Sequence, residues 1–571
     1  MARWRFLAFF LVLGAGQPSL ANRANWSPEF EVSFPTSTHR QPITGRLLLM
    51  LSRTNQPEVR YQASEFNSPP MFGIDVSQLP AGQVAVIDGK VPGFPLRSLR
   101  DLPTGEYYVQ ALLNVYTEFH RADGHVIWAH MDQWEGQHFN RSPGNLFSKP
   151  QLIRFDGARS GKIKISLTEV IPPIQVPADT EWVKHIKIRS ELLTRFWGRP
   201  MYLGAVVLLP RGYGDHPDTR YPVIYEQAHF TLSAPFGFRT DDPPESDEDR
   251  SLREDLGFET GHEFYRSWSS DEFPRFIAVT FLHPTPYFDD SYAVDSANNG
   301  PYGTAIMTEL IPYIEKQFRI IAQPFARVLT GGSTGGWEAL ALQVLHPGFF
   351  GGTWALYPDP IDFRRFELVD IYRDNNMFVL EPGDVPRWVR QDWVASERAY
   401  MRADDGQPVT TMRQESQLEA VLGSKLRSGG QLAIYQAAFG PVGHDGYPEP
   451  LYDETTGVID RRVAVYMRDH GYDLRYYTET NWPRVGRQLS GKLKFYCGDM
   501  DNFYLNLGVR LFGEFLEKVD REYTRTALEY GPMKGHGWQP ITNAALVRLM
   551  AEHVAEQAPV GASLAWRSRL P

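Results

Sequence analysis

A glycine-rich turn at residues 331–336 constrains the fold of this 571-residue chain more than any other feature. It follows an apolar run at 327–330 and precedes a helix-favouring stretch at 334–345, which predicts a buried strand joined directly to a helix. Ser333 stands at the centre, with a glycine two positions before it and another two positions after it. A serine in so sharp a turn is held in a strained conformation, and close helix–strand packing leaves no room for flanking side chains. The pattern predicts a nucleophile; the alternative is a plain turn whose glycines serve packing alone.

The helix expected behind Ser333 adds to this prediction. Its first N–H groups have no partners within the helix, so they offer donors and a positive dipole end to an anionic intermediate. A phosphate-binding loop is disfavoured because no Lys-Ser or Lys-Thr follows the glycines. The turn therefore favours covalent acyl transfer.

Strand-like and helix-like segments alternate around the turn. Apolar runs rich in β-branched and aromatic residues lie at 202–209, 221–226, 276–282, 327–330, 352–357 and 492–496. Helices are expected at 303–318, 334–345, 505–519 and 541–558. Central strands that are apolar on both faces indicate a doubly wound, mostly parallel α/β sheet, as in α/β hydrolases.

Changes in the sequence pattern predict a division into parts. Short alternating strands separated by turn formers occupy 27–156 and indicate an antiparallel, Ig-like β-sandwich. Prolines mark 157–181 as an extended linker, and 182–571 is expected to form the α/β domain. Within that domain, 360–490 lacks strong strand signals and is expected to be a largely helical insertion, which either caps the site or decorates its rim.

Residues 1–21 have the pattern of a cleavable signal peptide. Two arginines precede an apolar run at 6–13 that is too short to span a bilayer, and small side chains for cleavage follow at 19 and 21. We therefore expect a secreted or periplasmic protein. No later window holds 18 consecutive apolar residues, so no membrane span is expected after cleavage.

Composition excludes several classes of function. The formal net charge is −10 and no run of lysine and arginine breaks the mixed pattern, so nucleic-acid binding is not expected. Cys497 is the only cysteine, which rules out an internal disulfide and a thiolate zinc cluster. The aromatic content of 13% is interpreted as core and loop packing in preference to a carbohydrate cleft. We expect no metal and no organic cofactor, although a structural calcium in the acidic insertion stays open.

A serine nucleophile needs an acid and a base, which α/β hydrolases supply downstream in the order serine, acid, histidine. The expected strand at 492–497 ends in a turn that carries Asp499 and Asp501. Both aspartates fit the acid, because the loops at the carboxyl ends of strands form the site, and the other one would cap the next helix. His536 stands between two glycines after a probable strand at 526–530 and is the candidate base, the alternative being an exposed loop histidine.

The oxyanion hole requires two N–H groups. Thr334, next to the nucleophile, is expected to supply one, and the amide of Phe230, in the loop after the strand at 221–226, is the candidate for the other. His229 is expected to shape that loop and not to act as a second base. Asp359 follows another strand and is a reserve candidate for the acid; its alternative role is loop structure.

These residues resemble the putative esterase family of α/β hydrolases, which includes esterase D-type enzymes, feruloyl esterases, enterochelin esterases and mycolyltransferases. The resemblance spans about 186–556 and rests on the motifs at 206–213, 221–225, 300–303, 309–312, 335–336 and 498–501. It implies that Ser333 is the nucleophile, His536 the base and Asp501, at the end of a Gly-x-x-Asp, the acid in preference to Asp499. A sandwich ahead of the hydrolase domain also resembles the enterochelin-esterase arrangement.

Two departures from the family pattern limit what the resemblance implies. His229-Phe230 stands where the family has His-Gly, so the oxyanion loop is expected to differ in shape. The insertion at 360–490 is not typical of the small esterases, so their substrates are not carried over.

The sequence therefore predicts an exported serine hydrolase that cleaves a carboxylic ester through an acyl-enzyme on Ser333. Its expected substrate is a small-molecule or glycan-linked ester. Three alternatives stay open: an acyltransferase using the same triad, a peptidase, and a non-catalytic exported glycan-binding protein with a relic triad.

Overall fold

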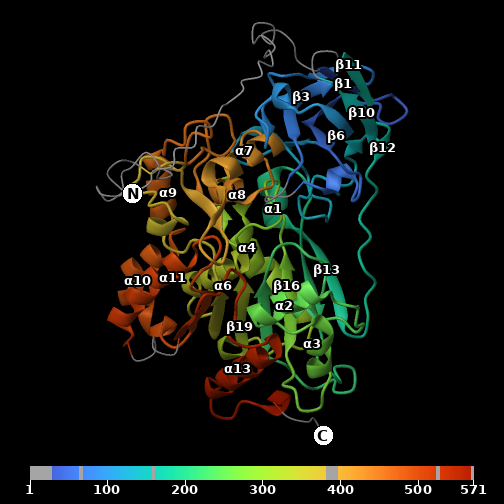
Figure 1. Ribbon diagram of the computed structural model, residues 1–571. Coiled ribbons are helices and arrows are strands. Elements are labelled where there is room, and N and C mark those ends of the chain that lie inside the picture. The colour runs from blue at the N-terminus through green and yellow to red at the C-terminus, as the bar shows by residue number, and fades with distance from the viewer. Residues whose placement is uncertain (1–28, 64–67, 157–160, 381–396, 522–526, 568–571) are drawn as a thin grey trace, which may run out of the picture.

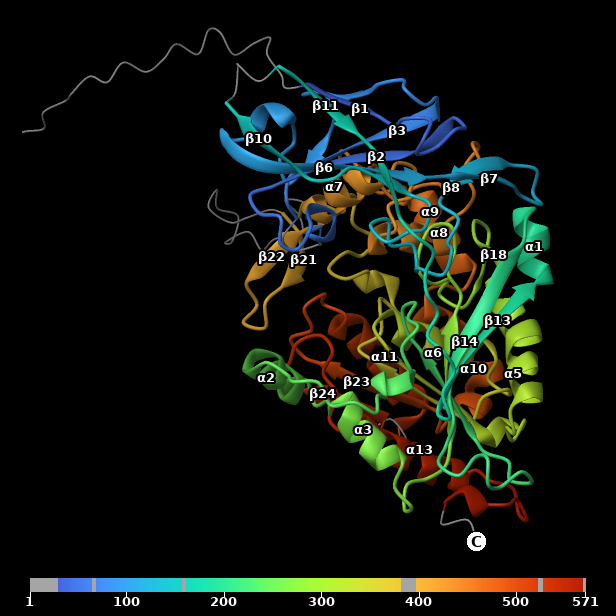
Figure 2. The ribbon, with the colours of Figure 1, turned by 90° about the vertical axis from the view of Figure 1, so that its right-hand side faces the viewer.

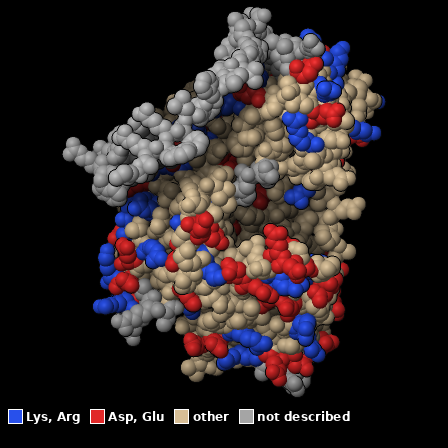
Figure 3. Space-filling view, in the orientation of Figure 1, with Lys and Arg blue, Asp and Glu red and all other residues tan. Residues whose placement is uncertain are grey.

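The structure is a computed structural model that describes residues 29–63, 68–156, 161–380, 397–521 and 527–567. The expected signal peptide lies outside the described residues. None of the helices in this part of the chain is long and apolar enough to cross a bilayer. Figures 1 and 2 show an upper part made of N-terminal strands and a lower part built around a central sheet. The space-filling view shows a hollow between these two parts (Figure 3).

The central sheet has eight strands in the order β13-β14-β16-β15-β19-β20-β23-β24. Their bounds are β13 Val183–Ser190, β14 Met201–Leu208, β15 Val223–Gln227, β16 Ile277–Leu282, β19 Arg327–Gly332, β20 Gly352–Leu356, β23 Leu493–Gly498 and β24 Leu528–Gly531. From β16 to β24 all neighbours pair in parallel, whereas β13 and β14 are antiparallel additions at one edge. The expected mostly parallel sheet is present, and β16 is buried along its whole length, as a central strand must be.

Helices of the lower part are α1 Glu191–Trp197, α2 Asp247–Leu256, α3 Gly261–Trp268, α4 Tyr302–Ala305, α5 Ile311–Gln317, α6 Thr334–Leu345, α11 Asn506–Val519 and α13 Asn543–Glu556. The single helix expected at 303–318 is instead two helices, α4 and α5, joined by a π-helical turn, η5, at Ile306–Leu310. Pro312 is the second residue of the second helix, and because proline has no N–H, it cannot continue the regular hydrogen-bond ladder there.

Two sheets form the upper part. A three-stranded sheet contains β11 Lys162–Ser166, β1 Glu29–Ser33 and β4 Ala85–Ile87. A seven-stranded sheet contains β12 Glu169–Val170, β9 Leu146–Phe147, β6 Gly105–Val115, β2 Ile43–Ser52, β3 Met71–Leu79, β5 Gly93–Phe94 and β10 Gln151–Phe155. One apolar core, which includes Phe30, Leu49 and Val109, is shared by the two sheets.

Two details of the upper part differ from expectation. The pairing of β1 with β11 is parallel, so the sheets are not antiparallel throughout. In addition, β11 and β12 fall inside 157–181, which was expected to be a linker. The alternation of lysine and isoleucine at 162–165 is the reason, because it suits an edge strand with one buried face.

The described part of the segment between β20 and β23 holds helices joined by long irregular stretches, so it is less helical than expected. It contains α7 Met412–Leu422, α8 Gln431–Phe439, α9 Arg461–Asp469 and α10 Leu474–Leu489, with a hairpin of β21 Ala399–Arg402 and β22 Pro408–Thr411. Both ribbon views place α7 directly under the N-terminal strands (Figures 1 and 2). Leu48 and Met50 of β2 share an apolar cluster with Leu418 and Val421 of α7. The insertion therefore packs against the N-terminal sheet, and other residues of it share an apolar core with the central sheet.

Arg46 adds directional hydrogen bonds to this apolar contact between β2 and α7. From the middle of β2 its guanidinium donates to the carbonyl oxygens of Val421 (3.0 Å) and Ala420 (2.7 Å) at the end of α7, and to Asp75 (3.0 Å). A cation that binds the last carbonyl groups of a helix also interacts favourably with the helix dipole.

We predict that Arg46→Ala lowers the free energy of unfolding by about 2–3 kcal/mol, the loss expected when hydrogen bonds to a charged group are removed from a mostly buried contact. Urea denaturation followed by circular dichroism measures it. Arg100→Ala, at an exposed position of the same part, is the matched control and should change stability by less than about 0.5 kcal/mol. Equal stabilities of the two variants would show that Arg46 does not hold α7.

Candidate active site

Ser333 lies between β19 and α6 in a backbone conformation that is rare for a residue other than glycine, with φ 57° and ψ −123°. The two glycines around it are required by space. A Cβ on Gly331 would lie 2.4 Å from the carbonyl oxygen of Gly335, and a Cβ on Gly335 would lie 2.0 Å from that of Gln227 in β15. The predicted strand–turn–helix around Ser333 is thus present, and its glycines permit α6 to approach the sheet.

The Ser333 hydroxyl donates a hydrogen bond to Asp359 Oδ1 at 3.1 Å. The other carboxylate oxygen of Asp359 accepts from Tyr292 (2.6 Å), Thr334 Oγ1 (2.7 Å) and Gln431 Nε2 (2.9 Å). Burial raises the pKa of Asp359, although the hydrogen bonds from Tyr292 and Thr334 oppose the shift. The reserve candidate for the acid therefore lies beside the serine and holds its hydroxyl.

His536, the candidate base, pairs with Asp501. Its Nδ1 donates to Asp501 Oδ2 at 2.8 Å, and Asp501 is fully buried. The carboxylate also accepts from the backbone N–H groups of Phe503 (3.0 Å) and Leu505 (3.2 Å). The imidazole is packed edge-on between the rings of Tyr357 and Phe503, with centroids 4.9 and 5.1 Å away. These contacts fix both the position and the tautomer of the ring.

Asp499 lies on the same turn but has a different partner. It accepts from the backbone N–H of Met533 at 2.7 Å and so ties the loop after β24 to the end of β23. Of the two aspartates that the sequence left open, Asp501 is therefore the one that contacts the imidazole. Burial alone would lower the pKa of His536, but the charge of Asp501 and its hydrogen bond raise the pKa above 6.5.

Ser333 and His536 line one cavity of about 210 Å³. The other lining residues are His229, Asp359, Glu367, Tyr400, Gln431, Tyr435, Phe503 and Leu505. Four of these, from Glu367 to Tyr435, belong to the insertion, so the insertion forms part of the wall of the cavity at Ser333. A second cavity, of about 420 Å³, adjoins it and shares His229 and Gln431.

Thr334 and Phe230, the two residues expected in the oxyanion hole, have different surroundings. Thr334 begins α6, so its N–H is one of the unpaired donors at the helix start, next to Ser333. The ring of Phe230 packs edge-on against Trp134 with centroids 5.5 Å apart, and its side chain does not line the Ser333 cavity. The expected donor is the amide of Phe230 and not its side chain, and that role stays a prediction.

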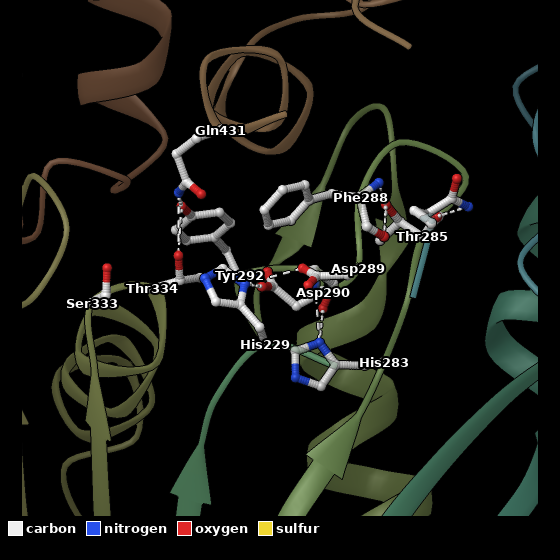
Figure 4. A network of polar contacts seen from close by, with 12 residues as sticks. His229, His283, Thr285, Phe288, Asp289, Asp290, Tyr292, Ser333, Thr334 and Gln431 are labelled. Atoms are coloured by element: carbon white, nitrogen blue, oxygen red, sulfur yellow. Dashed lines mark hydrogen bonds and ion pairs between the residues drawn. The ribbon is translucent and has the colours of Figure 1, made fainter. Parts of the chain in front are cut away.

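His229 is the residue whose setting the sequence analysis missed. Its Nδ1 lies 3.1 Å from Asp289 Oδ1 and 3.2 Å from Asp290 Oδ2, as Figure 4 shows. Burial disfavours the charged ring, but the two carboxylates outweigh it and raise the pKa of His229 well above 6.5. Adjacent aspartates after the strand at 276–282 were the available signal, but nothing in the sequence paired them with the loop after β15.

These three residues are also the only group in the described part of the chain that brings three potential metal-ligand atoms within 4.8 Å of one another. Their separations are those of a histidine hydrogen-bonded to two carboxylates. We therefore treat the cluster of His229, Asp289 and Asp290 as an ion-paired histidine.

Comparison with known proteins gives one family match and several distant structural likenesses. Residues 202–402 match the family model described as "Putative esterase". No curated protein matches the chain. The chain resembles several solved structures distantly. A ferulic acid esterase is 16% identical, with 65% of this chain and 97% of that one covered and a TM-score of 0.31. The S-formylglutathione hydrolase of Staphylococcus aureus is 11% identical (65% and 99% covered, TM-score 0.30).

A siderophore hydrolase from Aspergillus nidulans is also 11% identical, with 67% and 99% covered and a TM-score of 0.31. Likenesses this distant assign no substrate. The family match, by contrast, covers the central strands, the turn at Ser333 and the start of the insertion. On that match residues 202–402 are similar to the putative esterase family of α/β hydrolases, which supports a carboxylic ester hydrolase.

Proposed function

We propose that this chain is an exported serine esterase that cleaves a carboxylic ester through an acyl-enzyme on Ser333. His536 is its general base and Asp501 the acid that orients the imidazole. The observation that carries the proposal is that a strained serine at the start of α6 and a histidine bonded to a buried aspartate open onto one cavity. Export rests on the pattern of residues 1–21.

In the acylation step the Ser333 hydroxyl turns from Asp359 to His536 Nε2 and gives it the proton as Oγ attacks the carbonyl carbon. The tetrahedral oxyanion accepts a hydrogen bond from the N–H of Thr334. The intermediate collapses, the bond to the alcohol oxygen breaks, and His536 returns the proton to that oxygen. Water then repeats the sequence on the acyl-enzyme and releases the acid.

The size of the cavity at Ser333 favours a small acyl group as the part of the substrate bound there. A volume of about 210 Å³ lined by Tyr400, Tyr435, Phe503 and Leu505 suits a small, partly apolar group. The adjoining cavity of about 420 Å³ gives room for the rest of a small-molecule or glycan-linked ester.

We predict that a fluorophosphonate probe labels the folded protein and that Ser333→Ala abolishes labelling, since Oγ is the atom that attacks. Turnover of 4-nitrophenyl butyrate should fall by on the order of 10⁶ in kcat, the loss expected when a triad nucleophile is removed. Ser37→Ala, at an exposed serine of the upper part, is the matched control. A wild-type protein that folds but is not labelled would favour the non-catalytic binding protein.

Activity should depend on pH through His536, which must be neutral to accept the proton. Because its pKa is raised above 6.5, kcat/KM should be lost as pH falls through a midpoint above that value. Asp501→Asn removes the main charge that raises the pKa and the acceptor that orients the ring. The midpoint should therefore move to lower pH and kcat fall by about 10³–10⁴.

Asp499→Asn is the matched control for that pH profile, because Asp499 lies on the same turn and contacts Met533 instead of the imidazole. It should leave the midpoint unchanged. A shifted midpoint in Asp499→Asn together with an unshifted one in Asp501→Asn would show that Asp499, and not Asp501, is the acid.

A further inference from the structure

The mechanism proposed for Ser333 and His536 does not use the imidazole of His229, although this ring lies at the same cavity. It lines the same cavity as Ser333, and 48% of its side-chain surface is accessible. In Figure 4 the ring lies between Ser333 on one side and Asp289 and Asp290 on the other. This inference rests on the proposed esterase function and assigns a further residue to it.

One end of the ring is held rigidly. Nδ1 lies within hydrogen-bond distance of both carboxylates, at 3.1 and 3.2 Å, so it carries a proton. Asp290 is itself buried and accepts from the backbone N–H of Tyr292 at 3.0 Å, which fixes it in turn. With Nδ1 fixed on the aspartate side, Nε2 is directed to the opposite side of the ring.

The paired carboxylates also keep the ring charged, because they raise the pKa of His229 well above its usual value against the effect of burial. A charged imidazole has a proton on each nitrogen. Nε2 is therefore a cationic donor, and it faces the side on which Ser333 lies.

Such a donor would add to the backbone N–H groups expected at the oxyanion. Thr334 offers one N–H beside Ser333, and the amide of Phe230 is the candidate for a second. The carboxyl group of Asp359 lies 3.1 Å from the attacking hydroxyl. Its negative charge would oppose the charge that develops on the carbonyl oxygen, and a fixed cation nearby offsets that effect.

We propose that His229 is a catalytic residue whose Nε2–H donates a hydrogen bond to the carbonyl oxygen of the ester as that oxygen becomes an oxyanion. The Ser333 proton moves to His536 and then to the leaving alcohol, and the carbonyl π electrons move to the oxygen and return on collapse. His229 keeps its proton throughout and serves as a donor and a counter-charge.

The other role open to a cation here is to anchor a carboxylate of the substrate. The lining of the two cavities does not favour it. Asp359 lies in the catalytic cavity, and Glu415 and Glu419 line the adjoining one, so an anionic substrate group would meet negative charge on both sides of His229.

The test compares wild type with His229→Gln and His229→Ala on neutral 4-nitrophenyl butyrate and on anionic 4-nitrophenyl hemisuccinate. For His229→Ala we expect kcat to fall by about 10²–10³ on both esters with KM changed less than about threefold, the pattern of a lost oxyanion donor. His229→Gln keeps a neutral N–H donor and should lie between Ala and wild type. His120→Gln, at an exposed histidine of the upper part, should be unchanged.

Unchanged circular dichroism and melting of both His229 variants show that any loss is not one of folding. An unaffected kcat, or a rise in KM confined to the hemisuccinate, overturns this inference while an active wild type leaves the proposed function standing. A wild type that is neither labelled nor active on any ester overturns both, and it does so without a variant.

Discussion

The close approach of α6 to the strands β15 and β19 is the constraint on which the site depends. It exists only because Gly331 and Gly335 carry no side chain, since a Cβ at either position would overlap backbone atoms. The strained conformation of Ser333 costs on the order of 1–3 kcal/mol, and the almost complete burial of α6 offsets it. The same packing positions Ser333 just beyond the end of β19 and brings the unpaired N–H groups at the start of α6 beside this serine.

Two histidines lie near the serine, and each is held by aspartate side chains. Asp501 holds His536, and the aspartates Asp289 and Asp290 hold His229, so both imidazoles are oriented from behind by carboxylates. Asp359 contacts the serine itself, with three donors on one carboxylate oxygen and the Ser333 hydroxyl on the other. In this arrangement the Ser333 hydroxyl is hydrogen-bonded to Asp359, so under the proposed mechanism it must turn from Asp359 to His536 before it attacks.

Sequence alone predicts the parts of this site that depend on local pattern. The strands, the turn at Ser333 and the turn after β23 follow from apolar runs and glycines, but both Asp499 and Asp501 fit that last turn, and only the family resemblance favoured Asp501. The contact of Ser333 with Asp359 could not be predicted, because it depends on how the loop after β20 folds back over the neighbouring strand. The pairing of His229 with Asp289 is likewise a contact between loops of two strands, to which no periodicity refers.

The N-terminal sheet is connected to this site through a short series of contacts. Arg46 of β2 holds the end of α7, and Glu419 of α7 accepts from the backbone N–H groups of Leu432 (2.7 Å) and Ala433 (2.8 Å) at the start of α8. That helix begins with Gln431, whose side chain donates to Asp359 beside the serine. An arginine within the apolar run of β2 was the sequence signal of a buried contact there, because an unpaired charge is not tolerated in a core. The upper sheets therefore take part in positioning the insertion beside the cavity at Ser333, and they are more than an appended module.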